Sequence, residues 1–474
     1  MRVGRSIRHA RVSVKAQVGH TMQPWLDGAR LTGDHGELFE DSTDMMIDQR
    51  DRRSDEDTDM QPSSSPRVVI AGGGLAGLSL ALALKRSLGA GIEVTMADPA
   101  LRRDPSADKR AYAIAAAGRR LLEALGIWPL VAGEAQPILE MTLTDSSLAD
   151  PVRPVFLNFV EEIAPGEPFA HMVEGGDLTR ALVAACTENG VVLKAAAVER
   201  FTAGSAAVTV QFSDGERSDA ALLIAADGGR SRLRDAAGIG WISFPYGQSA
   251  IVATIAHERD HEGRAVQHFL PGGPFAILPL KPGGPLGFRS SIVWSERSSE
   301  VPTLLSLDTQ DLLAEVERRF GLQLGQLAFE TKPQAFPLSF GVARRFVGDR
   351  IALLGDAAHV IHPIAGQGLN LAFHDAAALA DAIVEAVRLG LDPGSEAALQ
   401  GYERARRLDV TAMGATTDLL NRLFSNDVLP VRLIRDLGLG LVDRMPTMKR
   451  FFIRQAAGVA SGNAAPRLLR GELP

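Results

Sequence analysis

The 474-residue sequence contains one cysteine, Cys186. A lone thiol cannot close an intramolecular disulfide, and it excludes a metal site built from several cysteine ligands. A chain without disulfides suits a reducing compartment. We therefore predict a cytoplasmic protein.

Long apolar runs and a basic excess are also lacking. The longest uncharged candidate for a membrane span, residues 68–84, is shorter than the roughly 20 residues that a span needs, and it is rich in glycine. The formal net charge is −7, whereas nucleic-acid binding needs a concentrated basic face. We expect neither a transmembrane segment nor a nucleic-acid partner.

Residues 1–65 differ in composition from the rest. They begin with a basic stretch that has no acid before Asp27, and a stretch dense in charge and poor in large apolar residues follows. Such a segment buries too little surface to offset its ordering entropy. We interpret it as disordered, or as an extension upstream of a true start near Met45, Met46 or Met60. A targeting peptide is the alternative.

From Arg67 onward, the pattern indicates alternating strands and helices. Short apolar segments predict buried strands at residues 67–71, 92–97, 220–227 and 350–356. Stretches of period two predict an antiparallel sheet from residues 206–212, 275–280 and 289–294. The last 100 residues are predicted to be mainly helical, so the expected class is α/β.

The first motif that carries chemistry follows residues 67–71. Gly72, Gly74 and Gly77 form G-x-G-x-x-G between an apolar strand and a helix. These glycines permit a tight turn, close approach of a pyrophosphate and close helix–strand packing. Asp98 lies about 20 residues further on, where an acid can accept hydrogen bonds from a ribose. The unit predicts dinucleotide binding, and because no second one follows a strand, we expect one stably held dinucleotide.

Two further turns carry candidate residues. Asp227 and Gly228 close a strand before a basic segment, which taken alone indicates an ordinary turn. Gly355 and Asp356 end another strand, and the small residues of "PIAGQGLN" precede a helix expected to start near Leu369. A helix N-terminus can stabilise an anion or an electron-rich ring edge there. His359 and His362 lie nearby, but without a carboxylate–histidine pattern they predict no metal site.

In this order, the three motifs resemble those of the single-component FAD-dependent aromatic hydroxylases, over residues 66–474. The resemblance narrows to the ubiquinone-biosynthesis hydroxylases through residues 107–128, 267–280, 290–296, 336–380 and 462–474. The resemblance implies a Rossmann-like FAD-binding domain, an inserted mixed or antiparallel β-sheet substrate domain and a helical C-terminus. It places the FAD domain mainly at 66–140, 172–243 and 340–400, the substrate sheet mainly at 141–171 and 244–339, and the C-terminal helices at 401–474.

The same resemblance implies the site and the reaction. NAD(P)H would reduce FAD, reduced flavin and O2 would give a C4a-hydroperoxide, and its distal oxygen would hydroxylate a polyprenylated phenol or quinol precursor of ubiquinone. Pro363, His362 and Gly366 would form a catalytic loop at the flavin face. The cofactor-binding residues would be Gly72, Gly74, Leu75, Ala76, Gly77, Asp98, Arg110, Asp227, Gly355, Asp356, Ala365, Gly366, Gln367, Gly368, Leu369 and Asn370.

Two alternatives keep the same fold. One is a soluble hydroxylase of small phenols, and the other is a non-catalytic flavin-binding scaffold of a biosynthetic complex. An acidic phenol calls for a positive anchor in the pocket, whereas a lipid tail calls for an apolar tunnel. Residues 429–458 mix apolar and basic side chains, which suits peripheral contact with the inner membrane, docking on a partner of a ubiquinone-biosynthesis complex, or packing on the FAD domain.

Overall fold

The computed structural model describes residues 65–145, 155–160, 162–363, 366–424, 454, 456–459 and 462–474. The chain divides into two units, Met1–Pro62, which lies outside the described residues, and Ser63–Pro474. The predictions for the N-terminal extension, for Ala365 and for most of residues 429–458 fall outside the described residues. The architecture that follows belongs to the second unit.

A six-stranded sheet forms the first layer, in the order β19-β20-β12-β1-β2-β8. Its strands are β1 (Arg67–Ala71), β2 (Glu93–Ala97), β8 (Val192–Lys194), β12 (Leu222–Ala225), β19 (Val347–Gly348) and β20 (Ile351–Leu353). All pairs are parallel except β19–β20. The four strands predicted from short apolar segments are confirmed as β1, β2, β12 and β20. They are almost wholly apolar because a parallel sheet is covered on both faces.

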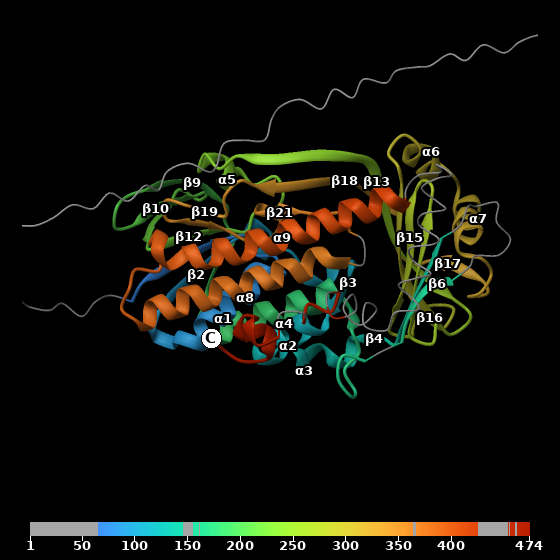
Figure 1. Ribbon diagram of the computed structural model, residues 1–474, viewed down its shortest axis with the longest axis horizontal. Helices are drawn as coiled ribbons and strands as arrows, with labels where there is room; N and C mark the ends of the chain where they lie inside the picture. The colour runs from blue at the N-terminus through green and yellow to red at the C-terminus, as the bar shows by residue number, and fades with distance from the viewer. Residues whose placement is uncertain are drawn as a thin grey trace, which may run out of the picture. The chain divides into compact units, whose positions relative to one another are not determined.

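Helices pack around this sheet and complete the main hydrophobic core. The long helices are α1 (Leu75–Leu88), α4 (Gly175–Glu188), α8 (Gln367–Arg388) and α9 (Glu396–Phe424), and the short ones are α2 (Ala116–Ala124), α3 (Trp128–Val131) and α5 (Arg232–Ala236). Helix α8 contacts both α1 and α9, and Figure 1 shows α8 and α9 running side by side. The helical C-terminal region is thus confirmed over the part that the structure describes.

The second layer is a nine-stranded sheet, ordered β21-β18-β13-β16-β15-β14-β5-β6 with β17 paired to β13. Its strands are β5 (Glu140–Asp145), β6 (Val155–Phe159), β13 (Trp241–His257), β14 (Arg264–Leu270), β15 (Gly273–Leu280), β16 (Phe288–Arg297), β17 (Leu327–Phe329), β18 (Gln334–Ala343) and β21 (His359–Val360). The sheet is mixed, because β14 pairs with β5 in parallel and the other pairs are antiparallel. Strands β13 and β18 run from the first layer into this sheet (Figure 1).

Two three-stranded sheets complete the unit. One is β9 (Val198–Ala203), β10 (Val208–Phe212) and β11 (Arg217–Ala220), and the other is β3 (Ala111–Ala115), β4 (Gln136–Ile138) and β7 (Ala170–Glu174). The second packs against the nine-stranded sheet through a small apolar cluster that includes Ile138, Met172 and Ala265. The 3-10 helices are η1 (Gly89–Gly91), η2 (Pro99–Arg102), η3 (Pro105–Ala107), η4 (Ala132–Glu134), η5 (Gly355–Ala357), η7 (Gly462–Ala464) and η8 (Arg467–Arg470).

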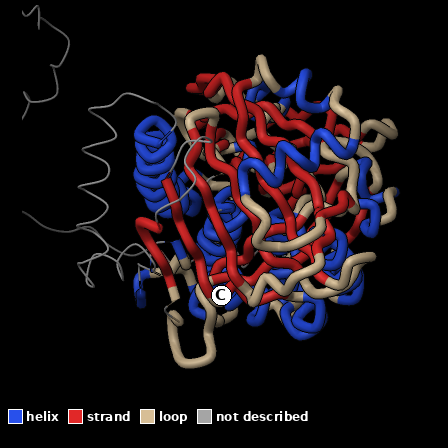
Figure 2. Tube along the Cα trace, turned by 90° about the vertical axis from the view of Figure 1, so that its right-hand side faces the viewer, coloured by secondary structure: helices blue, strands red, loops and turns tan. Residues whose placement is uncertain are grey.

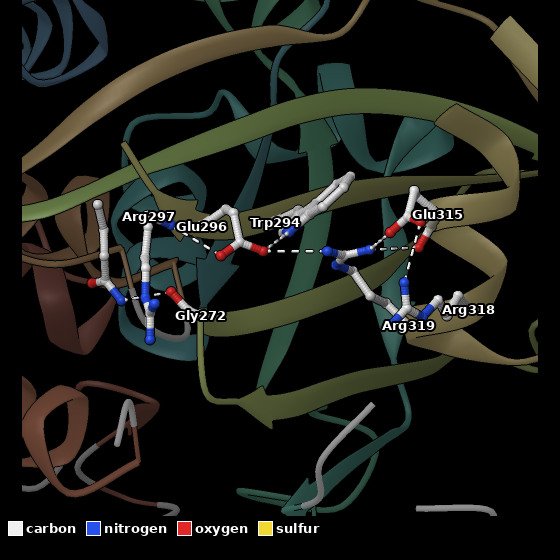
Figure 3. A network of polar contacts seen from close by, with 8 residues as sticks. Gly272, Trp294, Glu296, Arg297, Glu315, Arg318 and Arg319 are labelled. Carbon is white, nitrogen blue, oxygen red and sulfur yellow. Dashed lines mark hydrogen bonds and ion pairs between the residues drawn. The ribbon is translucent and has the colours of Figure 1, made fainter. Parts of the chain in front are cut away.

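Two helices, α6 (Val301–Leu305) and α7 (Thr309–Phe320), cover one face of the nine-stranded sheet. Figure 2 shows helical segments lying over the strands from that side. A polar contact fixes α7 at the strand end: Arg319 donates to Glu296 at 3.3 Å, pairs with Glu315, and stacks 4.0 Å from the ring of Trp294 (Figure 3). One sheet face is therefore committed to packing, and the opposite face is left for a site.

The fold class predicted from the sequence is confirmed: a Rossmann-like α/β domain, an inserted mixed sheet and a helical C-terminal region. Among the described residues, no helix is long and apolar enough to cross a membrane.

Candidate active site

A cavity of about 620 Å³ lies between the two layers. On one side it is bounded by the loops that follow β1, β12 and β20, whose carboxyl ends meet at one edge of the parallel sheet. Open α/β sheets bind ligands at this edge. On the other side it is bounded by the nine-stranded sheet, so one space joins a nucleotide-type edge to a sheet wall.

Most residues predicted for the site line this cavity, although they come from three separate parts of the chain. The lining includes Gly74, Leu75, Ala76, Gly77, Arg110, Gly355, Asp356, His362, Pro363, Gly366, Gln367, Gly368, Leu369 and Asn370. Gly72, Asp98 and Asp227 are not among the lining residues. They lie in the turns behind the cavity wall.

The turn between β1 and α1 depends on two glycines for close packing. A side chain on Gly72 would lie 2.1 Å from the carbonyl oxygen of Ala226, and one on Gly77 would lie 2.3 Å from that of Gly72. A side chain on Gly74, by contrast, would meet no atom within 4 Å. Space is thus kept open over the start of α1, where no side chain caps the helix and no acid lies in the first turn.

Asp98 supports this turn. Its carboxylate accepts from the backbone N–H of Gly73 and from that of Ala100, both at 2.7 Å. A carboxylate has about four lone-pair positions, so these two bonds leave acceptor capacity. Asp227 similarly accepts from the backbone N–H of Leu233 at 3.3 Å. Both acids hold loops that border the cavity.

A second helix N-terminus opens on the cavity at α8. The helix begins at Gln367, two residues before the expected start, because Gly366 adopts φ 64° and turns the chain into it. Asn370 ties this turn to β3: it donates to the carbonyl of Ala113 at 2.8 Å and accepts from the N–H of Ala115 at 2.9 Å. As in α1, no side chain caps the helix and no acid occupies the first turn.

Sequence reasoning missed a buried ionic cluster behind the Gly355 loop. Asp375, on α8, is fully buried. It accepts from the N–H of Gly355 at 3.0 Å and from Nε of Arg406 at 2.6 Å, and it lies 2.6 Å from Nε2 of His359. Burial alone would raise its pKa, but His359 and Arg406 hold it below the ordinary value. An acid within the otherwise apolar "AFHDAAALA" was the available signal.

Arg234 joins the second and third turns. It is buried, donates to the carbonyls of Gly229 at 3.1 Å and Ala357 at 3.2 Å, and stacks 4.0 Å from the ring of Trp241. The segment that taken alone indicated an ordinary turn therefore locks the Asp227 loop to the Gly355 loop.

His362 lies at the cavity wall and is fully buried. Its ring contacts that of Tyr246 edge-on at 5.0 Å, and neither ring nitrogen has a hydrogen-bond partner within the described chain. Burial lowers its pKa to about 4. The side chain is therefore neutral near pH 7. His359 belongs to the Asp375 cluster instead, and the described residues contain no group of three or more side chains able to hold a metal ion.

Only two charged residues line the cavity within the described chain, Arg110 and Asp356. Arg110 pairs with Asp108 at 2.8 Å, and this hydrogen bond raises its pKa. The Asp356 carboxylate is accessible from the cavity, but the enclosing protein limits its hydration and raises its pKa. Arg110 interacts with Asp356 across the cavity lining, and neither residue belongs to the sheet wall.

The sheet wall is apolar and built mainly of small residues. Because side chains alternate along a strand, every second residue faces the cavity: Ala250 and Val252 on β13, Ala265 and Gln267 on β14, Pro274, Ala276 and Leu278 on β15, Val293 and Ser295 on β16, and Phe336 and Leu338 on β18. Their neighbours pack under α7. A smaller cavity of about 380 Å³ lies beside the contacts of Arg319 with Glu296 and Trp294 that Figure 3 shows, and its lining is rich in charged residues.

These residues fit FAD. The open space above Gly74 suits a diphosphate against the N–H groups of α1. A side chain on Gly368 would likewise meet no atom within 4 Å, which leaves room for a flat ring at the start of α8. No acid in either first turn repels an anion. When bound, FAD would be held by the glycine loops, Arg110, Asp356 and the turn at Gly366.

Comparison with known proteins agrees with this geometry. The family model described as "FAD binding domain" matches residues 66–417. The ubiquinone hydroxylase UbiL of Rhodospirillum rubrum is 45% identical over 413 residues, covering 85% of this chain and 92% of that protein. The 3-demethoxyubiquinol 3-hydroxylase of Escherichia coli is 33% identical, covering 83% of this chain and 98% of that protein.

Solved structures show the same fold. The p-nitrophenol 4-monooxygenase PnpA of Pseudomonas putida superposes with a TM-score of 0.68 at 18% identity, covering 84% of this chain and 98% of that one. A variant of HpxO from Klebsiella pneumoniae, complexed with FAD, superposes with a TM-score of 0.64 at 21% identity, covering 85% of this chain and 99% of that one. The chain belongs to the ubiquinone-biosynthesis hydroxylases within the FAD-dependent aromatic hydroxylases, and it is an FAD-dependent monooxygenase.

Proposed function

We propose that this enzyme hydroxylates the aromatic ring of a polyprenylated phenol or quinol intermediate of ubiquinone biosynthesis, with NAD(P)H and O2 as co-substrates. The observation that carries the proposal is the uncharged sheet wall of the cavity. Gln267 and Ser295 are the polar side chains on that wall, and the rest are apolar. The named activities of the two relatives above support the same class of substrate.

The charges that line the cavity favour this substrate over the small acidic phenol of the alternative hypothesis. Burying a carboxylate without a partner is costly, so a site for an acidic phenol needs a cation at the ring. The one basic residue in the described lining, Arg110, is already paired with Asp108, and His362 is neutral. A neutral ring with a hydrocarbon chain meets no such cost on this wall.

Bound FAD supplies the redox chemistry, with NAD(P)H as the reductant and O2 as the source of the transferred oxygen atom. The chain supplies position and dryness. Residues of the β1–α1 turn would hold the diphosphate, and the turn at Gly366 with the start of α8 would hold the ring edge, where helix N–H groups favour negative charge. The aliphatic wall excludes water from the reacting atoms.

We propose the same site residues as those inferred from the sequence, with roles divided by position. Gly74 to Gly77, Arg110, Gly355, Asp356 and the residues from Gly366 to Asn370 would contact FAD directly, while Gly72, Asp98 and Asp227 would shape the loops. Pro363 and His362 would bound the flavin face of the substrate space. The support for this division is which residues line the cavity.

We further propose that the enzyme draws its substrate from a membrane surface or from a partner protein. A polyprenyl chain has little solubility in water, so it must pass to the cavity from an apolar environment. The composition of residues 429–458 supports this idea, since it combines apolar and basic side chains. A cytoplasmic enzyme with peripheral contact to the inner membrane, or one member of a biosynthetic complex, satisfies this requirement.

The test compares two probes with the purified full-length chain. Its visible spectrum should show bound flavin, and 2-farnesylphenol should accelerate NAD(P)H oxidation and yield a hydroxylated product. 4-Hydroxybenzoate, which carries the carboxylate, should do neither. Stimulation and hydroxylation with 4-hydroxybenzoate alone would support the small-phenol hydroxylase. Bound flavin with no turnover on either probe would support the scaffold reading.

A further inference from the structure

Gln267 is a buried polar side chain that has no partner among the described residues. It lies on β14, its exposed fraction is 4%, and it lines the cavity. No described residue forms a hydrogen bond with its carboxamide. Buried polar groups are as a rule satisfied, and the Gln267 carboxamide is not sealed in the protein but opens on the cavity. The partner therefore belongs to what enters the cavity.

The sheet register places small side chains beside Gln267. Along one row of the cavity face, Gln267 pairs with Ala276 on β15, Ala276 pairs with Val293 on β16, and Val293 pairs with Val252 on β13. Adjacent strands lie about 4.8 Å apart, so this row of small side chains extends over several strands. The row forms a shallow, flat surface, and Gln267 stands at one end of it.

On the side away from this row, Gln267 pairs with Leu143 on β5, which is also apolar. Ser295 lies on the same cavity face but in the next row, opposite Ala250, so it is not a direct cross-strand neighbour of Gln267. A carboxamide offers two N–H donors and a carbonyl acceptor in one plane. An aromatic ring lying on the small residues would bring a ring oxygen to this plane.

We propose that Gln267 binds the un-ionised ring hydroxyl of the substrate and thereby sets which phenols the enzyme accepts, an inference that rests on the proposed function. Its carbonyl accepts from the hydroxyl, and its N–H group donates to the same oxygen or to a neighbouring ring oxygen. Gln267 is a substrate-positioning residue, and the small row sets the plane of the ring. The selected class is a neutral phenol with a free hydroxyl.

The experiment uses 2-farnesylphenol and its methyl ether, 2-farnesylanisole, which can accept a hydrogen bond but cannot donate one. Binding to the FAD-loaded full-length protein is followed through the flavin absorption bands. The wild type should bind the phenol on the order of five- to tenfold more tightly than the ether, as expected for one neutral hydrogen bond. In Gln267→Met, the Kd of the phenol should rise by that factor and the preference should vanish.

The matched control is Gln334→Met on β18. Gln334 lies in the same sheet but is exposed and does not line the cavity. It should keep the wild-type preference. Flavin content and Tm of both variants report folding, and the comparison of the two probes on the wild type needs no variant.

Two outcomes overturn the assignment of Gln267 while leaving the proposed function intact. One is tight binding of the phenol by a wild type that does not prefer it to the ether. The other is a preference that survives in Gln267→Met. If the wild type binds neither probe but binds 4-hydroxybenzoate, the proposed function fails, and the role of Gln267 in recognising a prenylphenol fails with it.

Discussion

At the scale of single residues, the Asp375 carboxylate holds three buried groups together behind the cavity. It is shared between His359, Arg406 and the N–H of Gly355, and all of these contacts are buried. A residue so placed positions the Gly355 loop without reaching the cavity. Its loss would leave His359 and Arg406 without the buried carboxylate that both contact.

Asp375→Asn should destabilise the protein by about 3–5 kcal/mol, because it leaves the buried Arg406 guanidinium with only the exposed Asp409 as a counter-charge. Asp409→Asn is the matched control, since Asp409 pairs with the same arginine but is 54% exposed. That change should cost at most about 1 kcal/mol. Urea unfolding of both variants measures the difference, and equal losses would show that the buried pair has no special weight.

His362 makes stability depend on pH. Its pKa is lowered from 6.5 to about 4 by burial, so between these values the unfolded chain binds a proton that the folded chain does not. Unfolding is then favoured as the pH falls from 6.5 towards 4, by up to about 3 kcal/mol for this group. His171 has a pKa lowered to about 4 by burial as well and acts in the same direction.

In His362→Gln, the loss of stability between pH 7.5 and pH 5 should be smaller than in the wild type, because one of these histidines no longer titrates. The measurement is the free energy of unfolding in urea at both pH values. His171→Gln should reduce the loss similarly. An unchanged pH dependence in His362→Gln would mean that His362 is charged in the folded protein.

At the scale of elements, the β1–α1 turn separates packing from binding. A side chain on Gly77 would collide with the carbonyl of Gly72, whereas one on Gly74 would meet only open space. The glycines of this motif thus have different roles. Gly77 brings the helix against the strand, and Gly74 leaves room for a ligand.

Gly77→Ala should destabilise the flavin-free protein by about 1–3 kcal/mol through overpacking. Gly74→Ala should leave the flavin-free protein within about 0.5 kcal/mol of the wild type but weaken FAD binding by at least about tenfold, since the added methyl group occupies the diphosphate space. Thermal unfolding without FAD and a titration with FAD separate the two effects. A destabilised flavin-free Gly74→Ala would show that this glycine also serves packing.

The sequence predicted the elements around the cavity well, because their signals are local. Apolar strands, the spacing of Gly72, Gly74 and Gly77, and small residues before a helix are all read within a few positions. The sequence could not predict the Asp375 cluster or the Gln267 row, because these depend on register and on contacts between distant segments. Gln267 and Val293 share a face only once β14, β15 and β16 are paired in their observed register.

At the scale of the whole unit, the active site exists only where two layers meet. The parallel sheet supplies the loops for a dinucleotide, and the mixed sheet supplies an uncharged wall. Neither layer alone encloses the space. Contacts that hold the layers together therefore serve the chemistry as well as the stability, because a gap between them would admit water to the reacting atoms.

Arg289 makes a related contact, which joins the nine-stranded sheet to the β3–β7–β4 sheet that also borders the cavity. From β16 it pairs with Glu174 at the end of β7 at 2.9 Å and with Glu330 at 2.7 Å, and all three side chains are only 20–22% exposed. Arg289→Met should cost about 1–3 kcal/mol, because two carboxylates lose their shared counter-charge. It should also raise the fraction of NAD(P)H oxidation that yields hydrogen peroxide instead of hydroxylated product.

Arg264→Met is the control for Arg289, because Arg264 also pairs with two acids from the same sheet region but is 42% exposed. Its loss should stay within about 1 kcal/mol, with the peroxide fraction unchanged. Urea unfolding and a peroxide assay during turnover with 2-farnesylphenol measure both effects. If Arg289→Met is destabilised but yields no larger fraction of hydrogen peroxide than the wild type, the Arg289 ion pairs stabilise the fold without sealing the cavity. Dryness must then come from the apolar wall and the loops alone.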